Sequence, residues 1–165
     1  MARSVFSGRY TAELDEQGTV LFLIGMRFNH WWRVDKWWPV FTAMPRMLRH
    51  LESRDAGLLG WHIWPGRTVL VVQYWRSTAE LHSFATDSSA PHAAAWRDFN
   101  RRVGSDGSVG IWHETYQARP GSTWSVYDNM PAFGLAAATN HTAVGRGRAT
   151  GTGTVNHAAG SQPHT

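Results

Sequence analysis

The stretch that decides the fold is residues 57–80, GLLGWHIWPGRTVLVVQYWRSTAE. It holds two apolar runs, 57–64 and 68–75, on either side of Pro65 and Gly66. A Pro-Gly pair between two such runs predicts a β-hairpin. Residues 77–80, STAE, follow at once and have the form of a capping box, which predicts the start of a helix. The stretch therefore predicts a strand, a turn, a strand and a helix in succession.

Upstream of this stretch, a strand and a helix are expected. Residues 20–24, VLFLI, form a continuous apolar run, which predicts a strand buried on both faces. Apolar side chains then recur at helical spacing through residues 35–53, after Asp35, which is a suitable N-cap. Pro45 lies in the middle of this segment and is expected to kink the helix or split it in two.

Downstream, a helix and a last strand are expected. The helix that starts at the capping box should break at residues 87–91. A second helix should begin at His92, because His92, Trp96 and Phe99 recur at helical spacing. Residues 109–117 predict the last strand.

The expected order is strand, helix, strand, strand, helix, strand, which is the ferredoxin-like, split βαβ arrangement of the α+β class. Its four-stranded antiparallel sheet has helices on one face only. The other face needs a cover, and a second copy of the same sheet is the simplest one. We therefore expect a homodimer of the dimeric α/β-barrel type.

The length of 165 residues and the hydrophobic content of 42% suit a single domain with its own core. We expect residues 1–138 to form this domain, with 120–138 as an irregular arm. Residues 139–165 are rich in Gly, Ala, Thr, His and Arg and have little to bury. This composition predicts a disordered tail.

Composition also restricts the partners. The chain has no cysteine, which excludes disulfides and thiolate ligands for zinc or haem. The net charge of +4 comes almost wholly from scattered arginines without a nucleic-acid motif, so no nucleic-acid partner is expected. No secretory signal and no run long enough to span a bilayer are visible, which predicts a cytoplasmic protein without a membrane partner. The ten Trp residues are typical of a ligand pocket or a subunit interface.

Two histidines are candidates for chemistry. His92 opens a helix directly after Pro91, with its ring on the same side as Trp96. It is either a helix-terminus histidine that a backbone group satisfies or a ligand of a metal or haem iron. His113 alternates with Ile111 and Thr115, which places it on the helix-covered face of the sheet. It is either a satisfied core histidine or a pocket acid/base.

Five further side chains could join the histidines. Arg27, Asn29 and Trp31 end the first predicted strand, and Gln73 and Trp75 lie on the third. Each alone fits strand-edge polarity or core packing. Together with the histidines they would form a polar cluster in an aromatic pocket, which is the usual composition of a small-molecule site.

Residues 9–135 resemble a family of small monooxygenase-like proteins in the dimeric α/β-barrel superfamily. The matching pieces include VQYWRS at 72–77 and GIWHETY at 110–116. Further matches lie at 8–11, 22–27, 39–48 and 129–131. The resemblance implies the same fold and a dimer.

Residues 74–135 are also similar, more distantly, to the haem-dependent aldoxime dehydratases. That resemblance implies a b-type haem with His92 as the iron ligand and His113 as a distal acid/base residue. Arg27 lies close to the position of that family's distal arginine. A comparison with haem-degrading monooxygenases of the same superfamily would instead group Asn29 and Trp75 with His92.

The leading functional hypothesis is thus a haem-binding enzyme that performs redox or dehydration chemistry on a small organic molecule. Its catalytic residues would be His113, Arg27 and Gln73. Its cofactor site would comprise His92 as the metal ligand, with Asn29, Trp75 and Trp96. Two alternatives remain: a cofactor-free monooxygenase-like enzyme with His113 as the base, and a non-catalytic dimeric binding domain.

Overall fold

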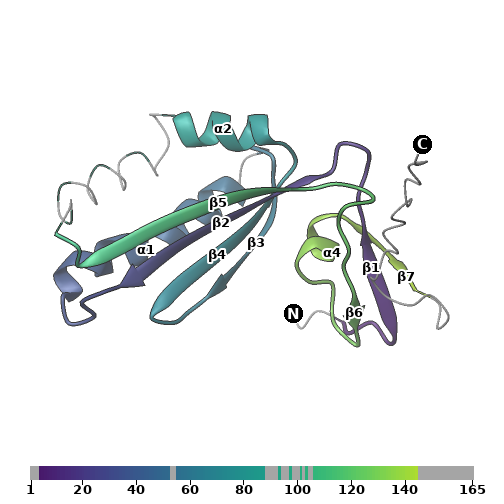
Figure 1. Cartoon of the computed structure of the whole chain (residues 1–165), viewed down its shortest axis with the longest axis horizontal. Helices are drawn as coiled ribbons and strands as arrows, with labels where there is room; N and C mark the ends of the chain where they lie inside the picture. Colours follow the sequence, from purple (N-terminus) through teal and green to yellow (C-terminus); the bar gives the residue numbers. More distant parts are fainter. Residues whose placement is uncertain are drawn as a thin grey trace, which may run out of the picture.

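The computed structural model of the chain describes residues 4–52, 55–87, 93, 97, 101, 103 and 106–144. The main sheet has four antiparallel strands in the order β3-β4-β2-β5 (Figure 1). Their bounds are Thr19–Phe28 for β2, Leu58–Trp64 for β3, Thr68–Trp75 for β4 and Val109–Ala118 for β5. Helix α1 (Val34–Glu52) follows β2 and helix α2 (Thr78–Thr86) follows β4. This connectivity and strand order define the ferredoxin-like fold, so the predicted fold class is confirmed.

Helix α2 begins where the sequence predicts, whereas α1 begins at Val34, so Asp35 lies in its first turn and is not its N-cap. In α2, the backbone N–H of Glu80 donates to Ser77 Oγ at 3.2 Å, and that hydroxyl donates to Glu80 Oε2 at 2.8 Å. Ser77 is therefore the N-cap that the sequence predicts, and the Glu80 carboxylate binds its hydroxyl instead of the backbone N–H of a full capping box. Helix α1 carries Pro39 and Pro45 within one continuous element, so Pro45 does not split it. None of the helices in the described ranges is long and apolar enough to cross a membrane.

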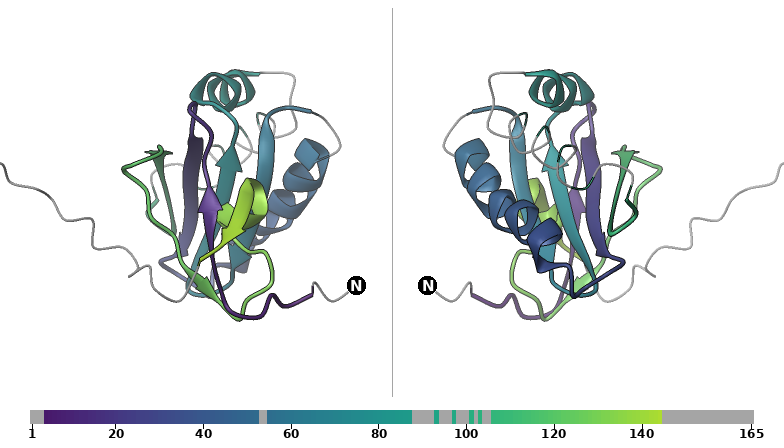
Figure 2. Two further views of the ribbon diagram at one scale, coloured as in Figure 1. Left: turned by 90° about the vertical axis from the view of Figure 1, so that its right-hand side faces the viewer. Right: turned by 90° about the vertical axis from the view of Figure 1, so that its left-hand side faces the viewer.

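The core lies between the main sheet and the helices. The end views of Figure 2 show α1 beside the strands of the sheet and α2 above them. It is divided into two apolar clusters. The first joins Val20 and Trp75 of the sheet to Leu51 of α1 and Leu81 of α2. The second is centred on Met26, Val103 and Val109, with Phe28, Trp37, Val40 and Ile111 packed against it.

A second, three-stranded sheet lies beyond one end of the main sheet (Figure 1). It consists of β1 (Arg9–Glu13), β6 (Tyr127–Asp128) and β7 (Asn140–Ala143), in the order β6-β1-β7. The sequence indicated no strand in any of these segments. Strand β7 lies beyond the expected domain boundary at 138. Its residues bury little by themselves, and their pairing with β1 holds them in a strand.

The segment between β6 and β7, which includes helix α4 (Leu135–Ala138), folds back onto the face of the main sheet that α1 and α2 leave open. The ring of Phe133 stacks on His62 of β3 at 4.2 Å, and the backbone N–H of Gly134 donates to His62 Nε2 at 3.3 Å. Part of the open face is therefore covered by the chain itself.

Replacement of Gly134 by alanine should destabilise this covering segment. Gly134 has a φ of 57° and a ψ of −130°, and an added Cβ would lie 3.1 Å from Tyr74 Oη. A backbone that only glycine adopts readily costs another residue about 1–3 kcal/mol. We expect Gly134→Ala to lower the free energy of unfolding by that amount in a denaturant titration.

Gly121 provides the matched control. It also has a positive φ, 77°, but no atom lies within 4 Å of an added Cβ. Gly121→Ala should therefore be the milder change. Equal losses in the two variants would contradict the expectation that an added Cβ at position 134 crowds Tyr74 Oη.

Candidate functional site

The pairing of β2 with its two neighbours decides which side chains share the helix-covered face. Directly opposed residues of an antiparallel pair point to the same side. Phe22 of β2 lies opposite Gln73 of β4 and Thr115 of β5. Two residues further along β2, Ile24 lies opposite His113. His113 is therefore on the helix-covered face, as its alternation predicts.

These five residues, Phe22, Ile24, Gln73, His113 and Thr115, form a strip that we call the central strip. It lies between the two apolar clusters of the core, one row of the sheet away from each. Phe22 and Ile24 are half-buried, and His113 and Thr115 are exposed. The helix-covered face is thus closed at both ends, and its middle is accessible on the β5 side and buried on the β4 side.

Gln73 is the buried polar residue of the central strip, with an exposed fraction of 2%. Its Oε1 accepts a hydrogen bond from Trp75 Nε1 at 2.9 Å, and Trp75 is completely buried. Because an indole N–H can only donate, this bond fixes which end of the Gln73 amide faces Trp75. The Gln73 Nε2 group points elsewhere, and within the described ranges no hydrogen bond satisfies it. A buried donor of this kind is a candidate contact for a ligand.

His113 lies on the other side of β2. Its ring centroid is 6.0 Å from that of Phe22, at an interplanar angle of 45°. No hydrogen bond to either ring nitrogen is present in the part of the chain that the structure describes. An accessible imidazole without a partner can accept a proton from a bound molecule.

The structure places the other predicted site residues elsewhere or does not describe them. Arg27 pairs with Thr68 across the sheet on the open face, and its Nη1 donates to Thr68 Oγ1 at 3.2 Å. Asn29 follows the end of β2, where its Nδ2 donates to the carbonyl of Gly107 at 2.9 Å. Neither joins the central strip. His92 and Trp96 lie outside the described residues.

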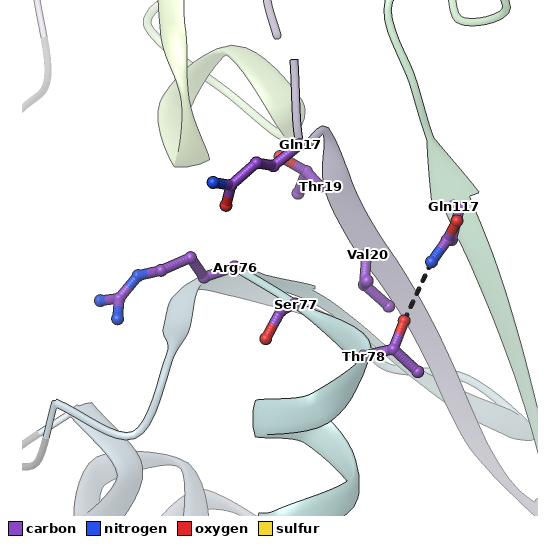
Figure 3. Close-up of a pocket in the computed structure, with 7 residues that line it drawn as sticks. All are labelled: Gln17, Thr19, Val20, Arg76, Ser77, Thr78 and Gln117. Carbon is purple, nitrogen blue, oxygen red and sulfur yellow. Dashed lines mark hydrogen bonds between the residues drawn. The ribbon is translucent and has the colours of Figure 1, made fainter. Parts of the chain in front are cut away.

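A small polar pocket of about 90 Å³ opens at the start of α2 (Figure 3). Sequence reasoning missed it because its walls come from distant segments. Its lining residues are Gln17, Thr19, Val20, Arg76, Ser77, Thr78 and Gln117.

The polar groups of this pocket are mostly satisfied within the chain. Arg76 pairs with Asp55 at 2.6 Å and Glu80 at 2.8 Å, and the hydrogen bond to Asp55 is the main cause of its raised pKa. Gln117 Nε2 donates to Thr78 Oγ1 at 3.1 Å. The pocket holds no group suited to nucleophilic or acid–base chemistry at neutral pH, so the central strip is the better candidate for an active site.

A family model described as "Monooxygenase af470-like" matches residues 19–135, so the chain belongs to this family. A curated relative is Monooxygenase af470 of Aspergillus fumigatus, which is 26% identical over 141 residues. The alignment covers 74% of this chain and 46% of that protein. The chain therefore spans about half the length of the curated relative that it matches.

Solved structures with a similar arrangement include SnoaB, a cofactor-independent oxygenase from Streptomyces nogalater. It is 14% identical, with a TM-score of 0.44 and coverage of 64% of this chain and 97% of that one. A putative antibiotic biosynthesis monooxygenase from Caulobacter crescentus CB15 is 13% identical, with a TM-score of 0.44. That match covers 60% of this chain and 90% of the other.

These findings confirm the resemblance to monooxygenase-like proteins and give no support to the one with aldoxime dehydratases. The expectation of a bound b-type haem is wrong; the finding against it is the description of SnoaB as cofactor-independent. The roles predicted for His92 as an iron ligand and for Asn29, Trp75 and Trp96 as haem contacts all presupposed that haem. Within the described ranges, no group of three or more His, Asp or Glu side chains could hold a metal ion.

Proposed function

We propose that the chain is a cofactor-free monooxygenase that acts on an electron-rich aromatic molecule, with His113 as the catalytic base. The observation that carries the proposal is the His113 imidazole, which is accessible and lies beside Phe22 on the helix-covered face. The membership of the chain in a monooxygenase-like family supports a monooxygenase reaction. This was the alternative hypothesis from the sequence.

The reaction needs no cofactor when the substrate itself supplies the electrons. A base removes a proton from a CH2 group that aromatic rings activate, and the resulting carbanion transfers electrons to O2. One oxygen atom becomes a carbonyl oxygen and the other leaves as water, so R2CH2 and O2 give R2CO and H2O. In this proposal His113 takes the first proton and returns it to the departing water.

The Gln73 amide fits the role of a hydrogen-bond donor to the same substrate. When a CH2 group conjugated with a ring carbonyl loses its proton, negative charge collects on the carbonyl oxygen. A buried, pre-oriented N–H donor stabilises such charge more effectively than water does. Gln73 Nε2 is such a donor, because Trp75 holds the oxygen end of the amide. Trp75 is then a positioning residue.

The spacing of the two residues suits a fused-ring molecule. Strands β4 and β5 lie on either side of β2, and His113 is offset from Gln73 by two residues along the sheet. Two strand spacings and two residues of rise together separate them by roughly 12 Å. A hydrogen bond at each end takes up about 3 Å. The remaining gap between the two side chains lies over the Phe22 ring. One or two fused rings would span it.

The test uses anthrone, whose CH2 group lies opposite its carbonyl across one ring. We expect the protein, with EDTA and without added flavin or haem, to consume O2 and produce anthraquinone. His113→Ala should reduce kcat by about 100-fold or more, since that is the usual contribution of a general base. Added imidazole should restore part of the loss. Anthraquinone absorbance provides the rate.

His82 provides the matched control, because it is an exposed histidine on α2 away from the central strip. His82→Ala should keep the wild-type rate. A His113→Ala rate within twofold of the wild type would contradict the proposal. Tight binding of anthrone by the wild type without turnover would favour the non-catalytic binding domain.

We also propose that the chain forms a homodimer through the part of the open face that remains uncovered. There Trp112 lies across Gly25, and Tyr116 is 51% exposed. The hydroxyl of Tyr116 donates to Glu114 Oε2 at 2.5 Å, which raises the pKa of Tyr116. Half-buried Leu21 and Leu23 of β2 lie beside them.

Sedimentation equilibrium should give twice the chain mass of 18.5 kDa, and a monomer at micromolar concentration would contradict the dimer.

A further inference from the structure

A group of exposed aromatic rings lies at the connection between β2 and α1. We call it the aromatic end and define it as Trp31, Trp32, Trp38 and Phe41. The exposed fractions are 67%, 60% and 52% for the three Trp residues and 36% for Phe41. Trp31 and Trp32 are in edge contact at 6.2 Å, and Trp38 stacks with Phe41 at 6.1 Å. Adjacent exposed apolar groups of this size usually mark an interaction surface.

The structure holds these rings outward. Trp37 occupies the inner side of the same helical turn, 4.7 Å from Phe28, and its Nε1 donates to the carbonyl of Trp31 at 2.9 Å. The backbone N–H groups of Asn29 and His30 both donate to the carbonyl of Ser108 at 3.1 Å. The connection is thus fixed to the core by Trp37 and to the start of β5 by its backbone. These bonds fix the backbone of the connection from which Trp31 and Trp32 project.

Two charged side chains beside the aromatic end are paired with carboxylates. Arg33 is paired with Asp35 at 3.2 Å, and Lys36 is paired with Asp106 at 3.2 Å. Hydrogen bonds from Ser108 lower the pKa of Asp106 to about 2, so it remains ionised.

Two arginines add charge to these pairs. Arg27 donates to Thr68, and Arg67 donates to the carbonyl of Phe28. In the described part of the chain neither has a carboxylate partner. These two arginines therefore leave the aromatic end with a net positive charge.

We propose that the aromatic end binds the surface of an anionic lipid membrane, with its rings in the interfacial layer. Trp is well suited to that layer because its ring is largely apolar while its N–H can remain hydrated. Basic side chains beside the rings are attracted to anionic headgroups. The start of α1 lies at the far end of the molecule from the second sheet (Figure 1).

A second copy of the chain fits this surface less well. A two-fold contact brings the same patch of both copies together, so Arg27 and Arg67 would face their own counterparts. An anionic surface takes up both the rings and the charge. The sequence predicted no membrane partner because no segment is long enough to span a bilayer, but surface binding does not need a spanning segment.

The experiment measures co-sedimentation of the full chain with vesicles. We expect binding to phosphatidylcholine vesicles that contain phosphatidylglycerol, and weaker binding to pure phosphatidylcholine. High salt should reduce the binding to the anionic vesicles. The combined variant Trp31→Ser, Trp32→Ser, Trp38→Ser should bind at least about tenfold more weakly, because the rings supply the apolar contact.

Trp124 provides the matched control, since it is 63% exposed but lies between β5 and β6. Trp124→Ser should bind like the wild type. Thermal unfolding checks that each variant folds. If the triple variant does not fold, Arg27→Ala with Arg67→Ala replaces it and should lower binding to anionic vesicles only.

Three results would overturn the proposal. The first is a wild-type chain that binds neither kind of vesicle. The second is a folded triple variant that binds as tightly as the wild type. The third is a wild-type chain that self-associates but does not bind vesicles, together with a triple variant that no longer self-associates. That result would assign the aromatic end to a second copy.

Discussion

The register of β2 against β4 and β5 is the constraint on which the rest of the structure depends. Ile24 lies opposite Val71 on one side and His113 on the other, and all ten residues of β2 are paired with β5. Because side chains alternate along a strand, a shift of one residue would move His113 to the open face. The same shift would expose the apolar residues of both core clusters to solvent. The packing of the core and the position of the candidate base are therefore decided by one set of hydrogen bonds.

This constraint explains why the candidate site combines a buried and an accessible polar group. On the β4 side of β2, α1 and α2 close over Trp75, and Gln73 is buried with it. On the β5 side, His113 remains accessible between the clusters. A molecule in the central strip would thus meet a fixed hydrogen-bond donor at its inner end and a proton acceptor at its outer end. This asymmetry is what the proposed reaction requires.

Local signals in the sequence predicted the main sheet well. Pro65 and Gly66 mark the hairpin, STAE at 77–80 marks the start of α2, and alternation along β5 places His113 on the correct face. The second sheet was not predictable in this way, because β1 pairs with β7 about 130 residues later and neither has a distinctive pattern. The continuous apolar run at 20–24 has no alternation, so it could not indicate that Arg27 faces away from His113. The haem hypothesis came from resemblance alone.

The most direct test of the account is a crystal structure of the chain with anthraquinone, the product of the proposed reaction. The account predicts the rings over Phe22, with one carbonyl oxygen within hydrogen-bond distance of Gln73 Nε2 and the other facing His113. Anthraquinone bound instead on the open face of the main sheet, or in the polar pocket at the start of α2, would contradict the assignment of the central strip as the active site.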